Sequence, residues 1–459
     1  MKRSIFLITI IALSITKTFA QHTGHEHSEK TIKSDTTKSN MGSMDEMPMD
    51  SMQMMSSSFS RNLPMNRNGS GTSWQPDSTP VYGYMANAGK WNFMFHGSIY
   101  LRYTYQDVNK AGKRGDKQLD APNWFMVMGQ RNIGKRGLFH FDGMFSLDRL
   151  TEGGNGYPLL FQTGESWNGR KLVDRQHPHD LFSELSIAYT HMINKDVDIT
   201  GYIGYPGEPA IGPTAFMHRI SAFNNPDAPL GHHWQDATHI TFGVATFGIR
   251  YKKFKLEGSS FTGREPNENR YNFDTPKFDS YSYRLSFNPT SNISMQVSRA
   301  FINSPEELEP GINIWRTTAS ISYNVMLGKE SHFTNTFVWG QNETSDHNTT
   351  PSFLLESNLQ LNKWALYGRY EGIQKAAEEL ELEPLFDTHK NFMINAVTIG
   401  TNYTLLNVFM TNAVIGLQAT MFSTEAALNT IYGKNPLSAQ VYLRINPGMM
   451  KMKMRSMKM

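Results

Sequence analysis

The sequence predicts an all-β protein, a transmembrane antiparallel β-barrel of about 16 strands preceded by a disordered N-terminal arm. Three observations support this prediction. The chain begins with an export signal. Its body consists of segments in which apolar and polar residues alternate with a period of two. The connections between these segments alternate between short and long, as they do between the two rims of an outer-membrane barrel.

Residues 1–20, MKRSIFLITIIALSITKTFA, are predicted to be a signal peptide. Lys2 and Arg3 precede an apolar run that ends at Ile15. Thr18 and Ala20 are the small residues at alternate positions that suit signal peptidase. We therefore expect the mature chain, which begins at residue 21, to be exported.

Composition excludes several other classes of protein. No later segment is apolar for the roughly 20 residues that a membrane-spanning helix needs. The chain has no cysteine, which excludes a lipobox anchor, a disulfide framework and a thiolate metal site. Loss of Lys2, Arg3 and Lys17 with the signal peptide lowers the formal charge from +3 to zero, so we expect no nucleic-acid partner.

Residues 21–80 form the predicted arm. They are rich in Ser, Thr, Asn, Met and His and poor in Val, Ile and aromatic residues, so they cannot bury enough apolar surface to fold alone. The chain also ends in a Met- and Lys-rich tail, residues 447–459, and we expect both arm and tail to lie in the periplasm. Methionine has no core to fill in such segments, and its thioether is a soft ligand for Cu(I). The candidate ligands are His22, His25, His27, Met41, Met44, Met47, Met49, Met52, Met54 and Met55 in the arm, and Met449, Met450, Met452, Met454, Met457 and Met459 in the tail.

Residues 81–446 are predicted to form the barrel. Between residues 91 and 106, one face of the chain carries residues such as Phe93 and Leu101, and the other carries residues such as His96 and Arg102. The same alternation recurs in all of the segments that we expect to be strands. These are 91–105, 123–131, 137–147, 182–192, 197–205, 237–250, 253–262, 279–288, 292–301, 313–326, 331–341, 352–361, 363–371, 391–404, 409–421 and 437–446.

The connections distinguish a membrane barrel from a soluble β-sandwich or propeller. Short connections such as NIGKR, PTS and LGKE alternate with long ones at 149–181, 206–236, 263–278 and 372–390. A soluble all-β fold gives no reason for two unequal classes of loop. With both termini in the periplasm, the long loops would lie at the cell surface or fold into the lumen.

The histidines concentrate in two of the long loops. Of 15 histidines, seven lie between residues 177 and 239. His191 shares a face with apolar residues, so we assign it to the headgroup belt and give it no role as a ligand. Imidazoles and carboxylates at close spacing can bind one cation, and Asp236 is placed to orient an imidazole. The candidate metal-binding residues of the loops are His177, His179, Asp180, Met217, His218, His232, His233, Asp236 and His239.

The donor set favours copper, although other transition metals remain open. Imidazole suits Cu, Zn and Ni, and a cysteine-free set of Met, His and Asp in an oxidising compartment fits copper best. The structural alternative is that the histidines and aspartates pair with one another in a polar plug of the lumen. Neither loop contains a tight motif that would identify the metal.

Four stretches of the chain resemble a Gram-negative family of outer-membrane barrels that is often found beside copper-resistance and efflux genes. They are SRNLPMNRNGSGTSWQPDSTP, DRQHPHD, FMHRISAFNNPDAPLGHHWQDATHITFGV and LEGSSFTGREPNENRYNFDTPKFDSYSYRLSFNP. The arm is also similar in composition to that of copper-resistance B proteins. The resemblance implies an outer-membrane barrel and implies little about its mechanism.

These observations predict an outer-membrane barrel that binds copper or another heavy metal and takes part in its resistance or efflux. Its expected partners are outer-membrane lipid, metal ions and periplasmic copper-efflux components. One alternative is a general or substrate-specific porin without metal dependence. Another is a hydrolase of lipid or lipopolysaccharide, in which Ser183 or Ser221 would act with a nearby histidine. We name no catalytic residue, because three neighbours on an extended chain do not converge as a triad.

Overall fold

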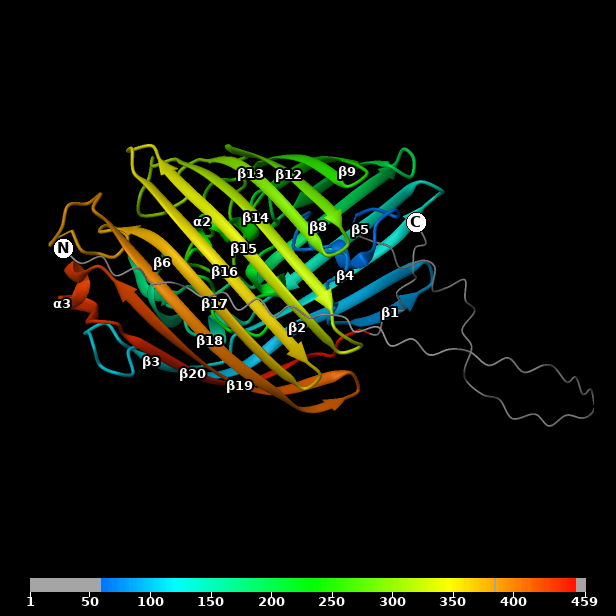
Figure 1. Cartoon of the computed structure of the whole chain (residues 1–459). Helices are drawn as coiled ribbons and strands as arrows, with labels where there is room; N and C mark the ends of the chain where they lie inside the picture. The colour runs from blue at the N-terminus through cyan, green and yellow to red at the C-terminus, as the bar shows by residue number, and fades with distance from the viewer. Residues whose placement is uncertain (1–58, 384, 451–459) are drawn as a thin grey trace, which may run out of the picture. The chain divides into compact units, whose positions relative to one another are not determined.

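The computed structural model describes residues 59–383 and 385–450 (Figure 1). The predicted signal peptide, the arm to residue 58 and the tail from residue 451 lie outside the described residues. The strands are β1 (Tyr84–Ala88), β2 (Trp91–Tyr105), β3 (Lys117–Asp120), β4 (Asn123–Ile133), β5 (Gly137–Phe145), β6 (Tyr157–Trp167), β7 (Arg170–Gln176), β8 (Phe182–Met192), β9 (Val197–Gly204), β10 (Val244–Tyr251), β11 (Phe254–Phe261), β12 (Ser280–Thr290), β13 (Ile293–Ile302), β14 (Ile314–Met326), β15 (Ser331–Thr344), β16 (Thr349–Leu361), β17 (Trp364–Ala376), β18 (Asn391–Val408), β19 (Thr411–Thr424) and β20 (Leu437–Pro447). The short helices are η2 (Met65–Arg67), α1 (Asp148–Thr151), η3 (Phe216–His218), α2 (His232–Gln235), η4 (Ala237–His239), η5 (Ala426–Leu428) and α3 (Asn429–Tyr432).

The strands form a closed antiparallel barrel. Sixteen of them, β2, β4, β5 and β8 to β20, each pair with their neighbours along the chain. The barrel closes where residues 99–105 of β2 pair with residues 439–445 of β20. The two short strands β1 and β3 extend the pairing of β2 at its opposite ends. The sixteen predicted segments correspond to these sixteen strands, so the predicted fold is confirmed.

The outer face of the barrel is apolar, as a membrane-spanning barrel requires. In β10 every second residue is exposed, including Phe247 at 55%, Ile249 at 45% and Tyr251 at 56%, whereas Thr246 and Arg250 between them are buried in the lumen. This alternation follows from the pleat of a strand, which turns successive side chains to opposite faces. No described helix is long and apolar enough to cross a membrane.

The predicted start of one strand is wrong. The segment 237–250 was expected to be extended throughout, but β10 begins only at Val244. Residues 237–239 form the turn η4, and Gly243 adopts a positive φ of 106° that interrupts the strand. His239 therefore belongs to a loop and not to the barrel wall.

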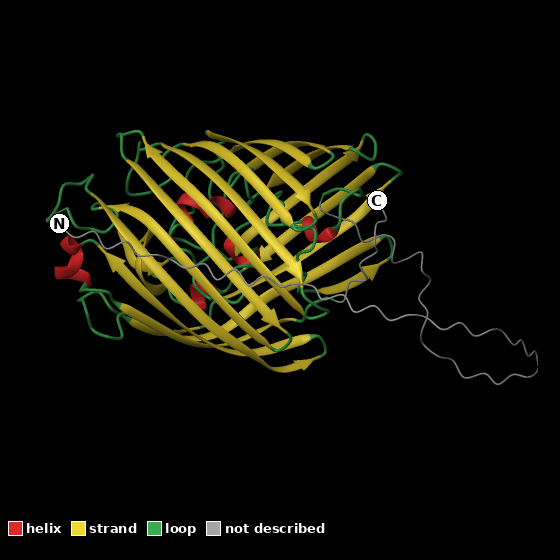
Figure 2. Cartoon of the chain, viewed as in Figure 1, coloured by secondary structure: helices red, strands yellow, loops and turns green. Residues whose placement is uncertain are grey.

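A long loop fills the lumen. Residues 205–243, the inserted loop, connect β9 to β10, and most of their side chains are buried. Figure 2 shows loops and short helices inside the ring of strands. Trp234 donates a hydrogen bond of 2.8 Å to Thr350 on β16, and Gln440 on β20 donates one of 2.6 Å to Asp227. The inserted loop therefore spans the lumen and bonds to the facing wall.

The N-terminal boundary of the barrel domain also differs from the prediction. The expected arm extends to residue 80, but residues 59–83, the lumen segment, pack against the inner wall near the short turns. Its Phe59, Leu63 and Trp74 are each less than 10% exposed. The Ser60 hydroxyl donates to Asp198 at 2.5 Å. The polar composition of residues 21–80 did not indicate that these few apolar residues would be buried, because the residues they pack against come from distant strands.

The hairpin of β6 and β7 was not predicted. It lies within the predicted loop 149–181, and its residues Leu160 and Phe161 are almost fully buried. They join an apolar cluster with Trp234 of the inserted loop and with Phe392 and Phe422 of the wall. The hairpin thus positions the chain that follows it, residues 177–181, beside the inserted loop.

Candidate metal centre

Five imidazoles gather inside the long-loop end of the barrel. The ring centroid of His232 lies 5.1 Å from that of His239, 5.3 Å from that of His233 and 6.3 Å from that of His177. His177 lies 5.6 Å from His233, and His179 lies 5.8 Å from His239. We call these five residues the histidine cluster. The two loops that the sequence singled out therefore meet.

Each ring of the cluster is oriented through its Nδ1 atom. The acceptors are Asp148 for His179 at 2.7 Å, Asp236 for His232 at 2.6 Å, the carbonyl of Asp236 for His239 at 2.9 Å, Glu265 for His233 at 3.2 Å and the carbonyl of Pro178 for His177 at 3.4 Å. The Glu165 carboxylate also lies 3.2 Å from Nδ1 of His177. The opposite Nε2 atoms of His177, His179, His233 and His239 are buried and have no hydrogen-bond partner in the described part of the chain. Histidines that bind metals are typically held in this way, with one nitrogen on a carboxylate or carbonyl and the other left for the ion.

Local structure explains how the inserted loop presents its histidines. The one-turn helix α2 places His232 and Asp236 four residues apart on one side, so that the carboxylate meets the ring. Arg219 donates to the other oxygen of Asp236 at 2.9 Å and to Glu356 on β16 at 2.9 Å. The turn is therefore tied to the wall, and the position of His232 is fixed.

The interior keeps most of the cluster neutral. Burial, the charge of Arg270 and the neighbouring imidazoles lower the pKa of His177 well below its usual value. Burial and the rings of His232 and His179 lower the pKa of His239 to about 3. Burial also lowers the pKa of His232, although the hydrogen bond and charge of Asp236 act to raise it. A neutral imidazole is the form that binds a metal ion.

His233 belongs to a second, tighter group of donors. One ligand atom of each of His233, Glu265 and Glu306 lies within 4.8 Å of the other two, and no other such trio occurs among residues 59–383 and 385–450. The Nε2 atom of His233 and the Oε2 atom of Glu265 are buried without a partner in this part of the chain. Burial alone would lower the pKa of His233, but the charge and hydrogen bond of Glu265 raise it. Burial and the charge of Glu265 raise the pKa of Glu306 to about 8.

Three predicted ligands lie outside the cluster. Asp180 pairs with Arg270 at 3.2 Å, so its carboxylate is already engaged. The ring centroid of His218 lies 5.5 Å from that of His96 and 5.0 Å from that of Trp124, towards the short turns. Met217 packs against a group of methionines on the wall. Met217 and His218 lie apart from the histidine cluster because the chain crosses part of the lumen between η3 and α2.

Of the arm and tail ligands, only Met449 and Met450 lie within the described residues. Met449 forms a bridge with Tyr82, and the Met450 amide donates to the Val81 carbonyl at 2.8 Å. Both lie at the short-turn end. His22, His25, His27, Met41, Met44, Met47, Met49, Met52, Met54, Met55, Met452, Met454, Met457 and Met459 lie outside the described residues.

Apart from Asp236, the acidic partners of the cluster are not among the ligands predicted from the sequence. Glu265 and Glu306 come from the β11–β12 and β13–β14 loops, and neither loop contains a histidine. A signal was present, because the stretch SPEELEP concentrates three glutamates in residues 304–310. The pairing of these loops with the inserted loop depends on the closed barrel, which no local pattern encodes.

The hydrolase alternative gains no support from the serines that it needs. The Ser183 hydroxyl donates to the carbonyl of Asp180 at 3.2 Å. The Ser221 hydroxyl donates to Thr336 at 2.8 Å and to Glu356 at 3.0 Å. Within residues 59–383 and 385–450, neither serine forms a hydrogen bond with a histidine, as a nucleophile and its base would.

The closed register, the apolar outer face and the polar lumen together decide the class of the molecule. The protein is an outer-membrane β-barrel. No family model and no curated protein matches this barrel chain.

Several solved outer-membrane proteins are similar to the chain at low identity. OmpT of Vibrio cholerae is 6% identical with a TM-score of 0.44, over 79% of this chain and 100% of that one. An anion-selective porin from Comamonas acidovorans is 9% identical with a TM-score of 0.46, over 78% and 99%. OmpF of Salmonella typhi, in complex with daunomycin, is 9% identical with a TM-score of 0.48, over 79% and 100%.

Proposed function

We propose that this protein is a porin-type outer-membrane channel that is closed by its own loops, and that a transition-metal ion bound by His233, Glu265 and Glu306 holds the closure at the long-loop end. The observation that carries the proposal is the convergence of these three donors within 4.8 Å from three separate loops. An ion bound there would join the inserted loop to the loops that follow β11 and β13.

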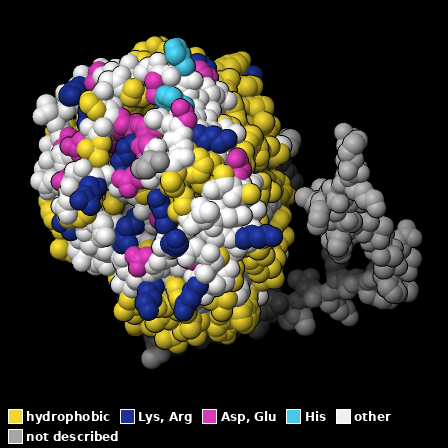
Figure 3. All heavy atoms as spheres, turned by 90° about the vertical axis from the view of Figure 1, so that its left-hand side faces the viewer, with side chains coloured by type: hydrophobic (Ala, Val, Ile, Leu, Met, Phe, Trp, Pro, Cys, Tyr) yellow, Lys and Arg dark blue, Asp and Glu magenta, His cyan; other side chains and the backbone are white. Residues whose placement is uncertain are grey.

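The charge of the long-loop end supports a cation as the ligand. Figure 3 faces this end, and charged side chains gather in its middle while apolar side chains lie along its border. Beside His233 lies a cavity lined by five glutamates and two basic residues, so acidic side chains predominate. The glutamates are Glu165, Glu306, Glu307, Glu309 and Glu379, and the basic residues are Lys171 and Arg316. Carboxylates around an opening raise the local concentration of cations. The cavity therefore gives an ion a route to the trio.

The donor set indicates which ions to expect. One imidazole with two carboxylates suits Zn²⁺ and other divalent transition metals, and further imidazoles suit copper as well. We therefore keep copper among the candidate ions, and a role in heavy-metal resistance or efflux as the cellular context. In this arrangement the long loops face the cell exterior, and the short turns and both tails face the periplasm and any efflux partner there.

A porin without metal dependence is the second candidate, and a specific observation favours it. The inserted loop is fixed to the wall by its own polar contacts, such as the pair of Arg219 and Glu356 at 2.9 Å. These contacts hold the loop without any ion. The two candidates differ in what removal of metal does to the closure.

The decisive experiment measures metal content and conductance together. Protein purified from outer membranes is loaded with Zn²⁺ or Co²⁺, challenged with a chelator and analysed for bound metal, with Glu306→Gln and His233→Ala beside the wild type. We expect both variants to lose the ion roughly tenfold or more readily than the wild type, because each lacks a ligand. The matched control is Glu383→Gln, an exposed glutamate of another long loop.

The same preparations are then placed in planar bilayers. Chelation should raise the conductance of the wild type and leave Glu306→Gln, which is already metal-poor, unchanged. Equal metal retention in all variants, with a conductance that the chelator does not alter, would establish the metal-independent porin instead.

A further inference from the structure

Four methionines face the lumen on three neighbouring strands near the short turns. They are Met94 on β2, Met126 and Met128 on β4 and Met144 on β5. Met94 is paired with Met128, and Met126 with Met144, so the four thioethers form one patch. Lumen-facing positions of outer-membrane barrels are normally polar. In the wall opposite, such positions hold buried polar residues such as Arg316 and Glu356.

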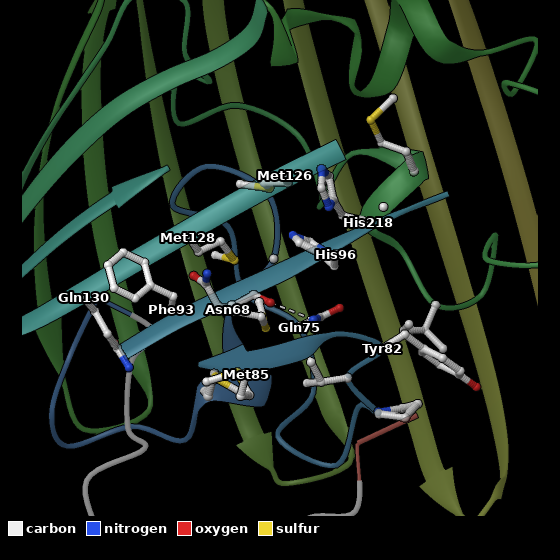
Figure 4. A pocket seen from close by; sticks show the side chains of 18 of the residues that line it. Asn68, Gln75, Tyr82, Met85, Phe93, His96, Met126, Met128, Gln130 and His218 are labelled. Atoms are coloured by element: carbon white, nitrogen blue, oxygen red, sulfur yellow. Dashed lines mark hydrogen bonds between the residues drawn. The ribbon is translucent and has the colours of Figure 1, made fainter. Parts of the chain in front are cut away.

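Met94, Met126 and Met128 line a cavity of the lumen, and Met144 packs against them in the same apolar group. Figure 4 shows Met126 and Met128 on the wall with His96 and His218 close by. The rings of His96 and His218 lie 5.5 Å apart, one on β2 and one in the inserted loop. We call this space the methionine cavity. Its other lining residues with thioether or imidazole groups are Met65, Met85, Met217 and His140.

Two imidazole nitrogens of the methionine cavity have no hydrogen-bond partner within the described residues. They are Nε2 of His96 and Nδ1 of His140, and both atoms are buried. A buried polar atom without a partner is costly unless a ligand satisfies it. Asp142 accepts from the other nitrogen of His140 at 2.8 Å, which orients that ring.

Packing alone does not account for the methionine patch. Methionine often fills irregular gaps in a core, where its flexible chain closes voids. Here Met126, Met128 and Met144 are at most 8% exposed, yet a cavity remains beside them. A dry apolar filling would also leave the two imidazole nitrogens unsatisfied. The combination of thioethers and free imidazole nitrogens is instead the donor set of a soft metal ion.

The methionine cavity lies between an entrance and the histidine cluster. Towards the short turns, Tyr82, Met85 and Phe223 also line an adjoining cavity of about 1530 Å³ that reaches the turn residues Asn362 and Lys363. In the other direction, Met217 and Trp124 also line a cavity of about 630 Å³, which contains His177 and His179. An ion in the methionine cavity would therefore be accessible from the short-turn end.

We propose that the methionine cavity binds a soft monovalent cation of the Cu(I) class through its thioethers and the imidazole of His96. Thioethers and neutral imidazoles bring no negative charge, which suits a monovalent ion better than a divalent one. The site is separate from His233, Glu265 and Glu306 and does not rest on the function proposed for them.

The test uses Ag⁺, a redox-inert ion of the same class, and the full chain purified from outer membranes. The variant Met94→Leu/Met126→Leu/Met128→Leu keeps side-chain volume and removes the three thioethers of the wall that line the cavity. We expect it to bind Ag⁺ at the cavity roughly tenfold more weakly or worse, measured as ions retained per chain after competition with a soluble chelator. The arm and tail methionines are the same in wild type and variant, so the difference isolates the cavity.

The control is Met295→Leu/Met421→Leu, which removes two methionines that are 39% and 51% exposed on the outer face. It should retain as much Ag⁺ as the wild type. A second variant, His96→Asn, removes the imidazole and should also lose Ag⁺, which keeps the test decisive if the triple variant fails to insert. Heat-modifiable gel mobility checks that each barrel has folded.

Equal Ag⁺ retention by the wild type, His96→Asn and a folded triple variant would overturn the proposal and leave the methionines as packing residues. Zn²⁺ or Co²⁺ retention, measured on the same samples, should be unchanged in the methionine variants. Failure of the divalent site would appear as Glu306→Gln retaining full Zn²⁺, whatever the Ag⁺ result, so the two failures are distinguishable.

Discussion

The two ends of the lumen differ in the chemistry of their donor groups. Near the short turns, the methionine cavity combines thioethers with imidazoles, and Asp142 is a carboxylate beside it. Near the long loops, imidazoles stand beside carboxylates such as Glu165 and Glu265. Hard oxygen donors and soft sulfur donors prefer different ions. One barrel can therefore offer two donor sets, here the two proposed sites, that differ in ion selectivity and are separated by the inserted loop.

The orientation of the barrel in the membrane decides which of the two sites faces the cell exterior. Labelling of a tag on intact cells tests this orientation, and we expect each tag to be either labelled or not labelled at all. A tag between Ser345 and Asn348, in the exposed β15–β16 turn, should be labelled on intact cells. A tag after Gly448, at the short-turn end, should be labelled only after lysis. Surface labelling of the second tag would reverse the assignment of the two ends.

The separation of the two ends depends on the inserted loop, so releasing the loop should have the next largest effect. Arg219→Met leaves Asp236 and Glu356 without their shared partner in a buried site, and breaking such a pair costs about 3–5 kcal/mol. We expect a marked rise in single-channel conductance.

Arg299→Met is the matched control for the loop. Arg299 pairs with Glu343 on the outside, where the side chains are 50% and 38% exposed. Exposed pairs contribute under about 1 kcal/mol, so conductance should not change. Equal conductance in the two variants would mean that the pair does not hold the loop.

The pH should distinguish the two sites, because their ion affinities should differ in pH dependence by up to about tenfold per pH unit. Because the pKa of Glu306 is about 8 and that of His233 is raised, protons compete with a divalent ion below pH 8. Zn²⁺ affinity at the long-loop end should therefore rise between pH 6 and pH 8, by up to about tenfold per unit for one displaced proton. Thioethers do not titrate. A pH-independent Zn²⁺ affinity would contradict the assignment of Glu306 as a ligand.

The smallest expected effect comes from a glycine beside the divalent site. Gly164 has φ +110°, and an added Cβ would lie 2.3 Å from Nε2 of His233. Gly164→Ala should displace the ring and weaken Zn²⁺ binding a few-fold. Gly169→Ala, with φ +68° and open space around it, carries only the backbone strain of about 1–2 kcal/mol and should leave Zn²⁺ affinity unchanged. Equal effects of the two substitutions would show that strain, and not the ring of His233, is responsible.

The barrel was predictable because its signal is local. Alternation of residues such as Ile249 and Arg250 follows from the two-residue repeat of a single strand, and it is visible without knowledge of the neighbours. The start of β10 was missed because η4 and Gly243 depend on contacts of the inserted loop. Strand pairing itself is a property of the closed sheet.

The candidate site was predictable only in part. The histidines cluster in the sequence, and Asp236 was predicted to orient an imidazole; the structure gives His232, four residues away, as that partner. Asp148 and Glu265 lie 31 and 32 residues from the rings that they orient, so only the folded loops bring them there. The methionine cavity left a local signal, because the strand phase already turns Met126 and Met128 to the lumen.

Asp227 of the inserted loop connects the loop to the seam at which the barrel closes. It accepts hydrogen bonds from Arg102 on β2 at 3.2 Å and from Gln440 on β20 at 2.6 Å. These two strands form the seam at which the barrel closes, so a single carboxylate bridges the first and last strands of the wall. A loop that remained outside the lumen would leave Arg102 and Gln440 at the seam without this carboxylate. Docking of the inserted loop and closure of the seam therefore stabilise each other, and we expect the two to be thermodynamically coupled.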